Sequence, residues 1–336
     1  MKNNKKVLFY SSVKDKSLFK IQQFYQIDIS ILDSLGYSVY TSNSISDAFF
    51  FWRYDFVFAY FYRYSLFVAF VAFLFGKRTY FTGGIDSLDR YISKGRSYQI
   101  QKYFFICCYL LSKKCIIVSR ADWNNVKNVL GKRDAKLVYS EHTIDVSLFN
   151  GDIKKEKSFI TIGWQGTVGN VQRKGIDIAL RIFKKLKETV FFEDYIFYIV
   201  GKEGCGTPYI KKLIDEYGLT NAVILTGAIS EKDKIQLLCR SKYYMQLSRY
   251  EGFGVAALEA LCAKNIVIHS GKGGLANRIY RYGIKFDIDQ EFNLSYADLQ
   301  KSLSYFNCKN LDMAVNEIRA YYSNERRKSD FEIFLA

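Results

Sequence analysis

The stretch Ser248-Arg249-Tyr250-Glu251-Gly252-Phe253-Gly254-Val255-Ala256-Ala257-Leu258-Glu259-Ala260-Leu261 decides how the rest of the chain is interpreted. It follows an apolar run, Tyr243 to Leu247, which is typical of a buried strand. Gly252 and Gly254 permit a tight turn and a close approach of a ligand to the backbone. The Ala/Leu segment after the turn predicts a helix, and the first N–H groups of a helix suit a phosphate or a sugar hydroxyl. The pattern therefore predicts a ligand site between a strand and a helix.

Two carboxylates frame this predicted site, Glu251 in the turn and Glu259 inside the helix. They are spaced to hold opposite ends of one elongated ligand. The Glu-x7-Glu spacing, with Gly-Phe-Gly after the first glutamate and Ala-Leu around the second, resembles the signature of retaining glycosyltransferases of family 4. The alternative is a surface loop followed by an ordinary helix with a solvated glutamate.

The resemblance implies an α/β fold of the GT-B type, with two Rossmann-like domains whose parallel sheets face each other across a cleft. With 336 residues the chain is long enough for two such domains. We expect a first domain over 1–150 that faces the acceptor and the membrane, and a nucleotide-sugar-binding domain over 158–310. A C-terminal helix over 311–336 is expected to pack back on the first domain. The polar residues 150–157 are interpreted as the linker and hinge between the domains.

A second glycine-rich stretch, Gly166 to Gly175, follows the apolar run Phe159 to Trp164 and precedes a segment with helical periodicity. A glycine loop that ends in two cations, Arg173 and Lys174, is a plausible cradle for a diphosphate. The family to which the chain is similar has a Lys-Gly pair here, and it also tends to have an arginine where this chain has Thr167. The alternative is that the two cations are solvated at the start of a helix.

The resemblance also implies a role for each residue of the site. Glu251 would hold hydroxyls of the donor sugar, Glu259 would accept hydrogen bonds from the ribose, and Lys174 with Arg173 would stabilise the leaving diphosphate. In the family, the leaving phosphate itself takes the proton of the acceptor. The predicted catalytic residues are Glu251 and Lys174, and the predicted donor-binding residues are Gly166, Thr167, Arg173, Lys174, Gly252, Phe253, Gly254, Val255 and Glu259.

The acceptor side is expected in the first domain, at Gly83, Gly84 and Asp86, which follow the strand-like run Arg78 to Thr82. The family often has a histidine at the end of this strand, and this chain has glycine. Backbone groups are therefore the expected contacts, and Asp86 either binds an acceptor hydroxyl or is a turn residue. Because neither an Asp-x-Asp motif nor a His/Cys cluster is evident, we expect neither a metal nor a cofactor.

The charge of the chain is strongly positive, +16 overall. Residues 1–150 contain 21 Lys and Arg against 11 Asp and Glu, which gives +10. Nucleic acid, anionic lipid and phosphate-bearing substrates all attract such a surface. Because no nucleic-acid-binding motif is present, an anionic membrane surface is the expected partner, and a merely solvated basic surface is the alternative.

The segment from Phe49 to Phe75 is the most apolar and aromatic part of the first domain. Ser65 to Phe75 is too short to span a bilayer, so the first interpretation is a helix buried against the sheet. Because Arg53 and Arg63 stand among the aromatic residues, partial insertion into a membrane interface is the alternative. The N-terminus lacks the apolar core of a signal peptide, and the seven cysteines indicate buried thiols in a reducing compartment.

The sequence thus predicts a cytoplasmic, peripherally membrane-bound enzyme that transfers a sugar from a nucleotide-sugar with retention of configuration. The expected acceptor is a saccharide, lipid-linked, in O-antigen or capsule biosynthesis. The alternative is a catalytically silent nucleotide-sugar-binding scaffold, which Thr167 and Asn277 favour because the family has Arg and Glu there. The donor, the linkage and the oligomeric state stay open.

Overall fold

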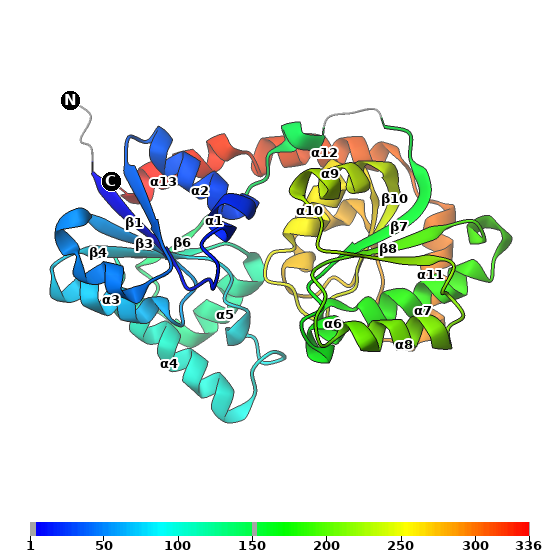
Figure 1. Cartoon of the computed structure of the whole chain (residues 1–336), viewed down its shortest axis with the longest axis horizontal. Helices are drawn as coiled ribbons and strands as arrows, with labels where there is room; N and C mark the ends of the chain where they lie inside the picture. Colours follow the sequence, from blue (N-terminus) through cyan, green and yellow to red (C-terminus); the bar gives the residue numbers. More distant parts are fainter. Residues whose placement is uncertain (1–4, 150–152, 336) are drawn as a thin grey trace. The chain divides into compact units, whose positions relative to one another are not determined.

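The computed structural model describes residues 5–149 and 153–335. The chain forms two compact units, the first made of Met1–Ile144 with Tyr322–Ala336 and the second of Asp145–Tyr321 (Figure 1). Residues 150–152 of the predicted linker lie outside the described residues, and the first strand of the second unit begins at Glu156.

The first unit is built on a six-stranded sheet in the order β2-β1-β3-β4-β5-β6, with every neighbouring pair parallel. The inner strands β1, β3 and β4 are buried on both faces almost throughout, as in a parallel sheet covered by helices on both sides. The elements are β1 (Lys6–Ser11), α1 (Leu18–Ile21), α2 (Gln23–Ser34), β2 (Ser38–Ser42), η1 (Ile45–Phe49), η2 (Phe51–Arg53), β3 (Phe56–Tyr60), α3 (Ser65–Leu74), β4 (Arg78–Thr82), η3 (Asp86–Leu88), α4 (Gly95–Leu111), β5 (Lys114–Ile117), α5 (Arg120–Leu130), β6 (Leu137–Tyr139) and, from the end of the chain, α13 (Asn324–Leu335).

The second unit is built on a six-stranded parallel sheet in the order β12-β11-β10-β7-β8-β9. Aromatic rings fill its core, where Phe159 stacks on Tyr243 of the adjacent strand at 4.6 Å between ring centroids. The elements are η4 (Val146–Phe149), β7 (Glu156–Ile162), α6 (Val168–Lys174), α7 (Ile176–Lys187), η5 (Val190–Phe192), β8 (Ile196–Val200), α8 (Thr207–Glu216), β9 (Val223–Gly227), α9 (Glu231–Arg240), β10 (Ser241–Gln246), α10 (Val255–Cys262), β11 (Ile266–His269), η6 (Gly273–Ala276), η7 (Arg278–Tyr282), β12 (Ile284–Lys285), α11 (Phe292–Ser304) and α12 (Lys309–Tyr321).

The strand order of the second unit determines where a ligand fits. From β7 the chain builds outward to β8 and β9 on one side, and then returns to build β10, β11 and β12 on the other. β7 and β10 are therefore the strands at which the order reverses, and open α/β sheets bind ligands beyond the carboxyl ends of such a pair. In the first unit the same reversal lies between β1 and β3.

The predicted α/β class with parallel sheets is confirmed, and several element boundaries differ from the prediction. Residues 18–34 form two helices, α1 and α2, separated by an extended Gln22, although their apolar spacing is typical of one continuous helix. The C-terminal stretch, predicted as a single helix, is also two helices. Of these, α12 belongs to the second unit and α13 to the first.

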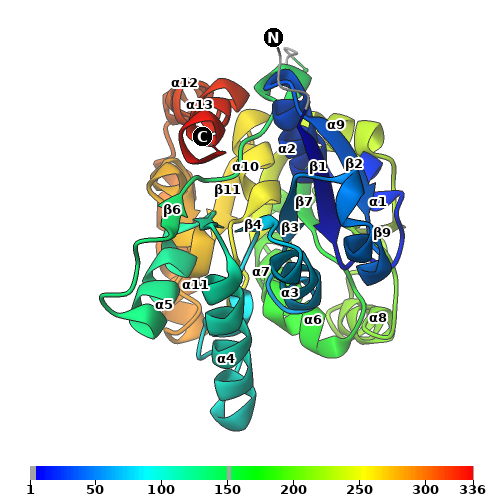
Figure 2. The ribbon, with the colours of Figure 1, turned by 90° about the vertical axis from the view of Figure 1, so that its left-hand side faces the viewer.

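The apolar segment after β3 is a helix packed on the sheet, as first interpreted, but only one side of it is buried. α3 buries Val68, Ala69, Val71 and Ala72, and it exposes Phe67, Phe70, Phe73 and Leu74 on its other side. α3 packs against β3, β4 and the helix α4, which lies next to it (Figure 2). Within residues 5–149 and 153–335, every helix is too short or too polar to cross a bilayer.

Candidate functional site

The candidate donor site lies in the second unit, where the loops after β7 and β10 meet. These two strands are adjacent in the sheet, with Tyr243 in register with Phe159. Because both strands point the same way, the loop 163–167 and the loop 247–254 leave the sheet at the same edge. The sheet thus brings together two segments that are about eighty residues apart in sequence.

The central contact of this site joins Lys174, the last residue of α6, to Glu251 in the loop after β10. The Lys174 Nζ lies 2.9 Å from Oε1 and 2.7 Å from Oε2 of Glu251, so both carboxylate oxygens accept from one ammonium group. The two side chains are only 20% and 14% exposed. The two residues predicted to be catalytic are therefore in direct contact.

Polar side chains of β10 and its loop hold the Glu251 carboxylate from the other side. Ser248 Oγ donates to Glu251 Oε2 at 3.2 Å, and Gln246 Nε2 lies 3.3 Å from the same oxygen. The Gln246 amide is itself oriented by Tyr244, whose hydroxyl donates to Gln246 Oε1. Sequence reasoning did not identify this chain of contacts, because Gln246 and Tyr244 stand inside an apolar strand pattern.

The charge of Glu251 is fixed by these neighbours. Burial alone would raise the pKa of its carboxyl, but the Lys174 ammonium, with Arg173 and the Ser248 hydrogen bond, outweighs burial and lowers that pKa. Glu251 is therefore an anion at neutral pH.

The glycine-rich stretch from Gly166 to Gly175 is not one loop, as predicted, but a short loop followed by the seven-residue helix α6. Thr167 is the N-cap of this helix, and its Oγ1 accepts from the N–H of Asn170 at 3.1 Å. Gly166 leaves no room for a side chain beside the ring of Trp164. Gly166 and Thr167 thus have roles in the local structure, because Gly166 makes room for Trp164 and Thr167 caps α6. The helix carries Arg173 and Lys174 at its C-terminal end.

Gly175 makes the close approach between the two site loops possible. It lies between α6 and α7 with φ of +68°, and a Cβ there would overlap the carbonyl oxygen of Leu247. Directly beside it, the Arg249 N–H donates to the Arg173 carbonyl at 2.8 Å. Arg173 also reaches back, with its Nη1 3.4 Å from the carbonyl oxygen of Tyr250. Lys174 faces Glu251 because the two backbones are fastened together at this point.

The turn Gly252 to Val255 leads into α10 and is held by the loop after β11. Gly252, Phe253 and Gly254 are buried, and Gly254 caps the helix with φ of +87° and no side-chain hydrogen bond. The Gly274 N–H donates to the Glu251 carbonyl at 2.6 Å, and the Tyr280 hydroxyl donates to the Gly254 carbonyl at 2.7 Å. These two hydrogen bonds hold the turn in place, and the start of α10 carries helix N–H groups that have no intrahelical partner.

Glu259 is buried in α10, with 2% of its surface exposed, and is paired with Lys234 of α9. The Lys234 Nζ lies 2.9 Å from both carboxylate oxygens and 2.7 Å from Glu231. Burial raises the pKa of the Glu259 carboxyl, and Lys234 opposes that shift only in part. Lys234 was missed by sequence reasoning, because a lysine on a charged helix carries no signal of its tertiary partner.

The residues offer little to a metal ion. Asp287-Ile288-Asp289 has an Asp-x-Asp spacing that the sequence reasoning overlooked, but Asp289 forms an ion pair with Lys272 and is 68% exposed. Over the part of the chain that the structure describes, no three His, Cys, Asp or Glu side chains are grouped as metal ligands would be.

Two of the three predicted acceptor residues, Gly84 and Asp86, line a cavity of about 300 Å³ in the first unit, beyond the carboxyl ends of β3 and β4. Gly84 and Asp86 form part of its wall together with Arg63 and Gln101. Gly83 has φ of +105° and packs against Phe61. The Ile85 N–H donates to the buried Asp122 carboxylate at 3.1 Å, which fixes the turn.

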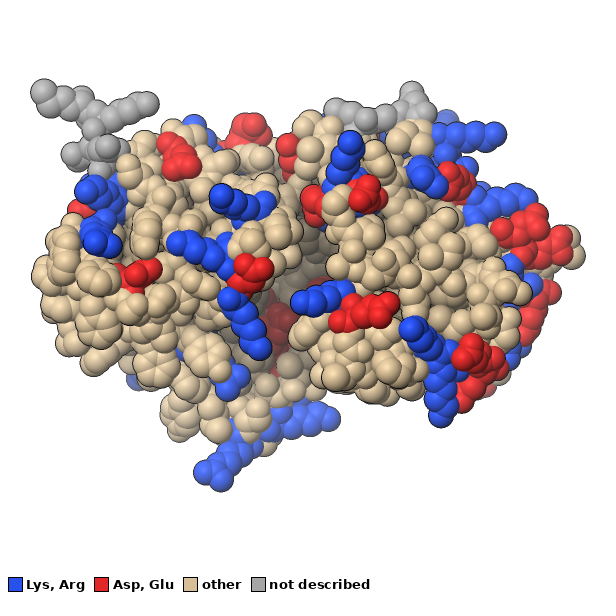
Figure 3. Space-filling model, in the orientation of Figure 1, with Lys and Arg blue, Asp and Glu red and all other residues tan. Residues whose placement is uncertain are grey.

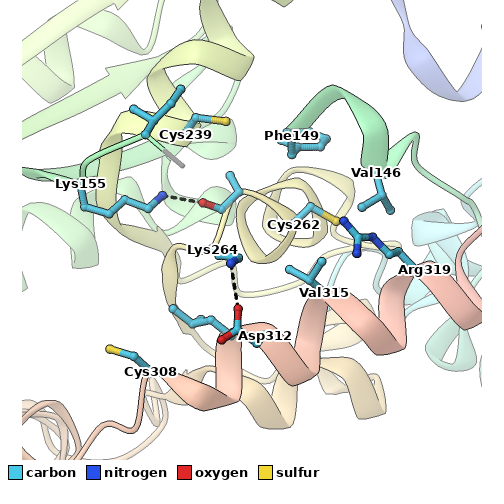
Figure 4. A pocket seen from close by; sticks show the side chains of 13 residues that line it. Val146, Phe149, Lys155, Cys239, Cys262, Lys264, Cys308, Asp312, Val315 and Arg319 are labelled. Carbon is cyan, nitrogen blue, oxygen red and sulfur yellow. Dashed lines mark hydrogen bonds and ion pairs between the residues drawn. The ribbon is translucent and has the colours of Figure 1, made fainter. Parts of the chain in front are cut away.

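A larger cavity, of about 520 Å³, lies elsewhere in the second unit (Figure 4). It is lined by Lys155, Cys239 and Lys264, which stand just before β7, β10 and β11. These are the amino ends of the strands, whereas Glu251 and Lys174 lie at the carboxyl ends. The Lys155 Nζ donates a hydrogen bond to the carbonyl oxygen of Ala263 at 2.5 Å. The Lys264 Nζ forms an ion pair with Asp312 Oδ1 at 2.8 Å. This cavity is separate from the candidate donor site.

Comparison with known families identifies the domain that carries the site. Residues 165–297 match the family model described as "Glycosyl transferases group 1", and this stretch contains every predicted donor-side residue. A curated GDP-mannose:cellobiosyl-diphosphopolyprenol alpha-mannosyltransferase from Xanthomonas campestris is 35% identical over 81 residues. That alignment covers 20% of this chain and 21% of the relative. The second unit thus contains a glycosyltransferase group 1 domain.

Solved structures match over almost the whole chain. HepE of Anabaena, in complex with UDP and glucose, has a TM-score of 0.75 at 14% identity and covers 98% of this chain and 99% of that one. WaaG, described as a glycosyltransferase involved in lipopolysaccharide biosynthesis, has a TM-score of 0.67 at 11% identity over 96% and 99% of the two chains. The fold is GT-B, as the sequence indicated.

Proposed function

We propose that the protein is a retaining glycosyltransferase that moves a sugar from a nucleotide-sugar donor to a saccharide acceptor. The observation that carries the proposal is the Lys174–Glu251 contact at the carboxyl ends of β7 and β10, inside a glycosyltransferase group 1 domain. This is the edge at which an open α/β sheet binds a nucleotide.

Each residue of the site is assigned one role in such a transfer. Lys174 supplies a cation for the diphosphate as its negative charge develops, and Arg173 lies next to it in the chain. Glu251 is an anion whose oxygens can accept from sugar hydroxyls once the donor engages Lys174. The unpaired N–H groups at the start of α10 suit an anionic group of the donor. Glu259, further along α10, is assigned to the ribose hydroxyls.

The acceptor is proposed to be a lipid-linked saccharide at the inner face of the cell membrane. The alignment with a mannosyltransferase that acts on cellobiosyl-diphosphopolyprenol supports this class, as does the likeness to WaaG. The +10 charge of residues 1–150 supports an anionic lipid surface as a partner. Synthesis of a surface polysaccharide such as O-antigen or capsule is the corresponding role.

The first test is donor binding followed by thermal unfolding. UDP-, GDP-, ADP-, CMP- and dTDP-sugars are screened against the wild-type protein, Glu259→Ala, and the control Glu216→Ala, which changes an exposed glutamate of α8. We expect one nucleotide class to raise the Tm of wild type and of Glu216→Ala, and to leave Glu259→Ala unchanged.

The second step uses the donor so identified. Transfer to a lipid-linked saccharide is followed by NMR of the anomeric proton, and retention of the donor configuration is expected. Donor binding without transfer or hydrolysis would replace the proposal with the silent nucleotide-sugar-binding scaffold. No binding of any donor would overturn the proposed site.

A further inference from the structure

The first unit presents an apolar face that its own fold leaves uncovered. Phe67, Phe70 and Phe73 are spaced three residues apart on α3, and each is at least half exposed. The spacing places them along one side of the helix, opposite the side that packs on the sheet. α3 contains no charged residue over its whole length. Such a contiguous face on a protein marks an interaction site rather than ordinary scatter.

The segment before β3 extends this face. Phe49, Phe50 and Trp52 are 55%, 36% and 63% exposed. Phe51 stacks on Phe75 with the ring centroids 4.2 Å apart, which fixes this segment against the end of α3. We call the exposed side chains of Phe49, Phe50, Trp52, Phe67, Phe70, Phe73 and Leu74 the α3 face. In Figure 3 the surface around α3 is largely free of charged side chains.

Cations stand next to the α3 face and acids are nearly absent. Residues 49–78 contain four Lys or Arg and one acid, Asp55. The Asp55 carboxylate accepts from the Lys6 N–H at 2.7 Å. Arg53 lies over the Phe50 ring at 4.8 Å, and Lys77 and Arg78 stand in the chain after the end of α3 at Leu74, with Arg78 as the first residue of β4. An apolar, aromatic surface flanked by cations is complementary to an anionic bilayer, because the rings enter the interface while the cations meet the head groups.

We propose that the α3 face is the surface by which this protein docks on an anionic lipid bilayer. Phe67, Phe70, Phe73 and Trp52 enter the interfacial layer, and Arg53, Lys77 and Arg78 contact the lipid phosphates. The inference deepens the proposed function, in which the acceptor is lipid-linked, by naming the surface that meets the membrane. Dimerisation through two α3 faces is not favoured, because it would bring their flanking cations together and these repel each other.

The test measures co-sedimentation with vesicles of phosphatidylcholine alone and of phosphatidylcholine with 30% phosphatidylglycerol at low salt. Four proteins are compared: wild type, Phe67→Ser/Phe70→Ser/Phe73→Ser, Arg53→Gln/Lys77→Gln/Arg78→Gln, and the control Val190→Ser/Phe191→Ser/Tyr305→Ser. The control removes exposed apolar side chains from the second unit. Circular dichroism and Tm establish that each variant is folded.

We expect wild type and the control to bind the anionic vesicles alike. Each of the other two variants is expected to bind at least about tenfold more weakly, with the charge variant losing its response to phosphatidylglycerol. Equal binding of the phenylalanine variant and wild type would overturn the proposal. So would a wild-type dimer in light scattering that becomes monomeric in that variant. Donor-induced Tm shifts are measured without vesicles, so a failure here is distinguishable from a failure of the donor site.

Discussion

Single residues decide the charge state of the candidate donor site, and Glu259 is an example. Its carboxylate is buried in α10, where an unpaired charge costs several kcal/mol. The ammonium of Lys234, 2.9 Å away, makes the ionised form tolerable. Lys234 therefore has a positioning role: it stabilises the ionised form of Glu259 and holds the orientation of its carboxylate.

Replacing Lys234 by methionine leaves the Glu259 carboxylate without its main cation. We expect the free energy of unfolding to fall by about 2–3 kcal/mol at neutral pH, somewhat less than for a fully buried pair. The pKa of Glu259, already raised by burial, rises further in the variant. The native state then holds a proton that the unfolded chain releases, so the variant loses stability as pH rises above about 4.3.

Urea unfolding at pH 5 and at pH 7.5 measures this difference. Lys232→Met, which changes an exposed lysine of the same helix, is the control. A gap between wild type and Lys234→Met that is the same at both pH values would contradict the pairing.

Lys174 is the residue with the largest expected effect on turnover. In Lys174→Gln the cation that we propose stabilises the leaving diphosphate is lost, and kcat/KM for transfer is expected to fall by about 10²–10³-fold. Lys185→Gln, an exposed lysine of α7, should leave the rate unchanged. Steady-state kinetics with the donor found in the screen provide the measurement, and a fall of less than about threefold would remove Lys174 from the catalytic step.

At the scale of elements, the position of Lys174 depends on how closely α6 and the loop after β10 approach each other. Gly175 has φ of +68° and faces the Leu247 carbonyl, so Gly175→Ala combines a strained backbone with a steric overlap. Gly218 has nearly the same φ, +66°, and nothing within 4 Å of a Cβ built on it. Gly218→Ala therefore isolates the backbone term.

We expect Gly218→Ala to cost about 1–2 kcal/mol. Gly175→Ala should cost at least about 2 kcal/mol more, because Leu247 must move. The displacement also moves Lys174 away from Glu251, so donor binding should weaken only in Gly175→Ala. Equal losses of stability in urea unfolding would mean that the two segments are not in close contact.

Elements with a local cause could be predicted from the sequence. The Ser230-x-x-Asp233 pattern is typical of the start of a helix, and the Ser230 Oγ accepts from the Asp233 N–H at 3.1 Å at the start of α9. The glycines from Gly166 to Gly175 led to the wrong prediction of one continuous loop. Glycine indicates backbone freedom, and it does not exclude a short helix such as α6 between two glycines.

Contacts between distant segments could not be predicted from the residues alone. The ion pair of Lys234 with Glu259 depends on how α9 packs beside α10, and nothing local to either helix encodes it. The exposure of α3 was misjudged for a related reason. An apolar helix is expected to be covered, but the sheet of the first unit offers contact to only one of its sides.

At the scale of the whole molecule, the chain ends in the unit in which it began. Arg327 of α13 is fully buried in the first unit, where its Nε and Nη2 donate to the two carboxylate oxygens of Asp28 in α2 at 2.6 and 2.8 Å. Its Nη1 donates to the Ser140 carbonyl at 2.8 Å. The last helix is thus fastened to the first unit by a bidentate buried ion pair as well as by Phe331 and Phe334 in the core.

Arg327→Met is expected to lower the stability of the first unit by about 3–5 kcal/mol, because it leaves the Asp28 carboxylate buried and unpaired. Asp28→Leu/Arg327→Met removes both charges and should recover part of that loss, since an apolar replacement of a buried pair is often close to neutral. Lys328→Met on the same helix is the control.

Trp52 and Trp123 lie in the first unit and Trp164 in the second. Urea unfolding followed by tryptophan fluorescence in a Trp164→Phe background therefore reports on the first unit alone. If the double variant were less stable than Arg327→Met, the loss would come from packing around the Arg327 side chain and not from an orphaned charge on Asp28.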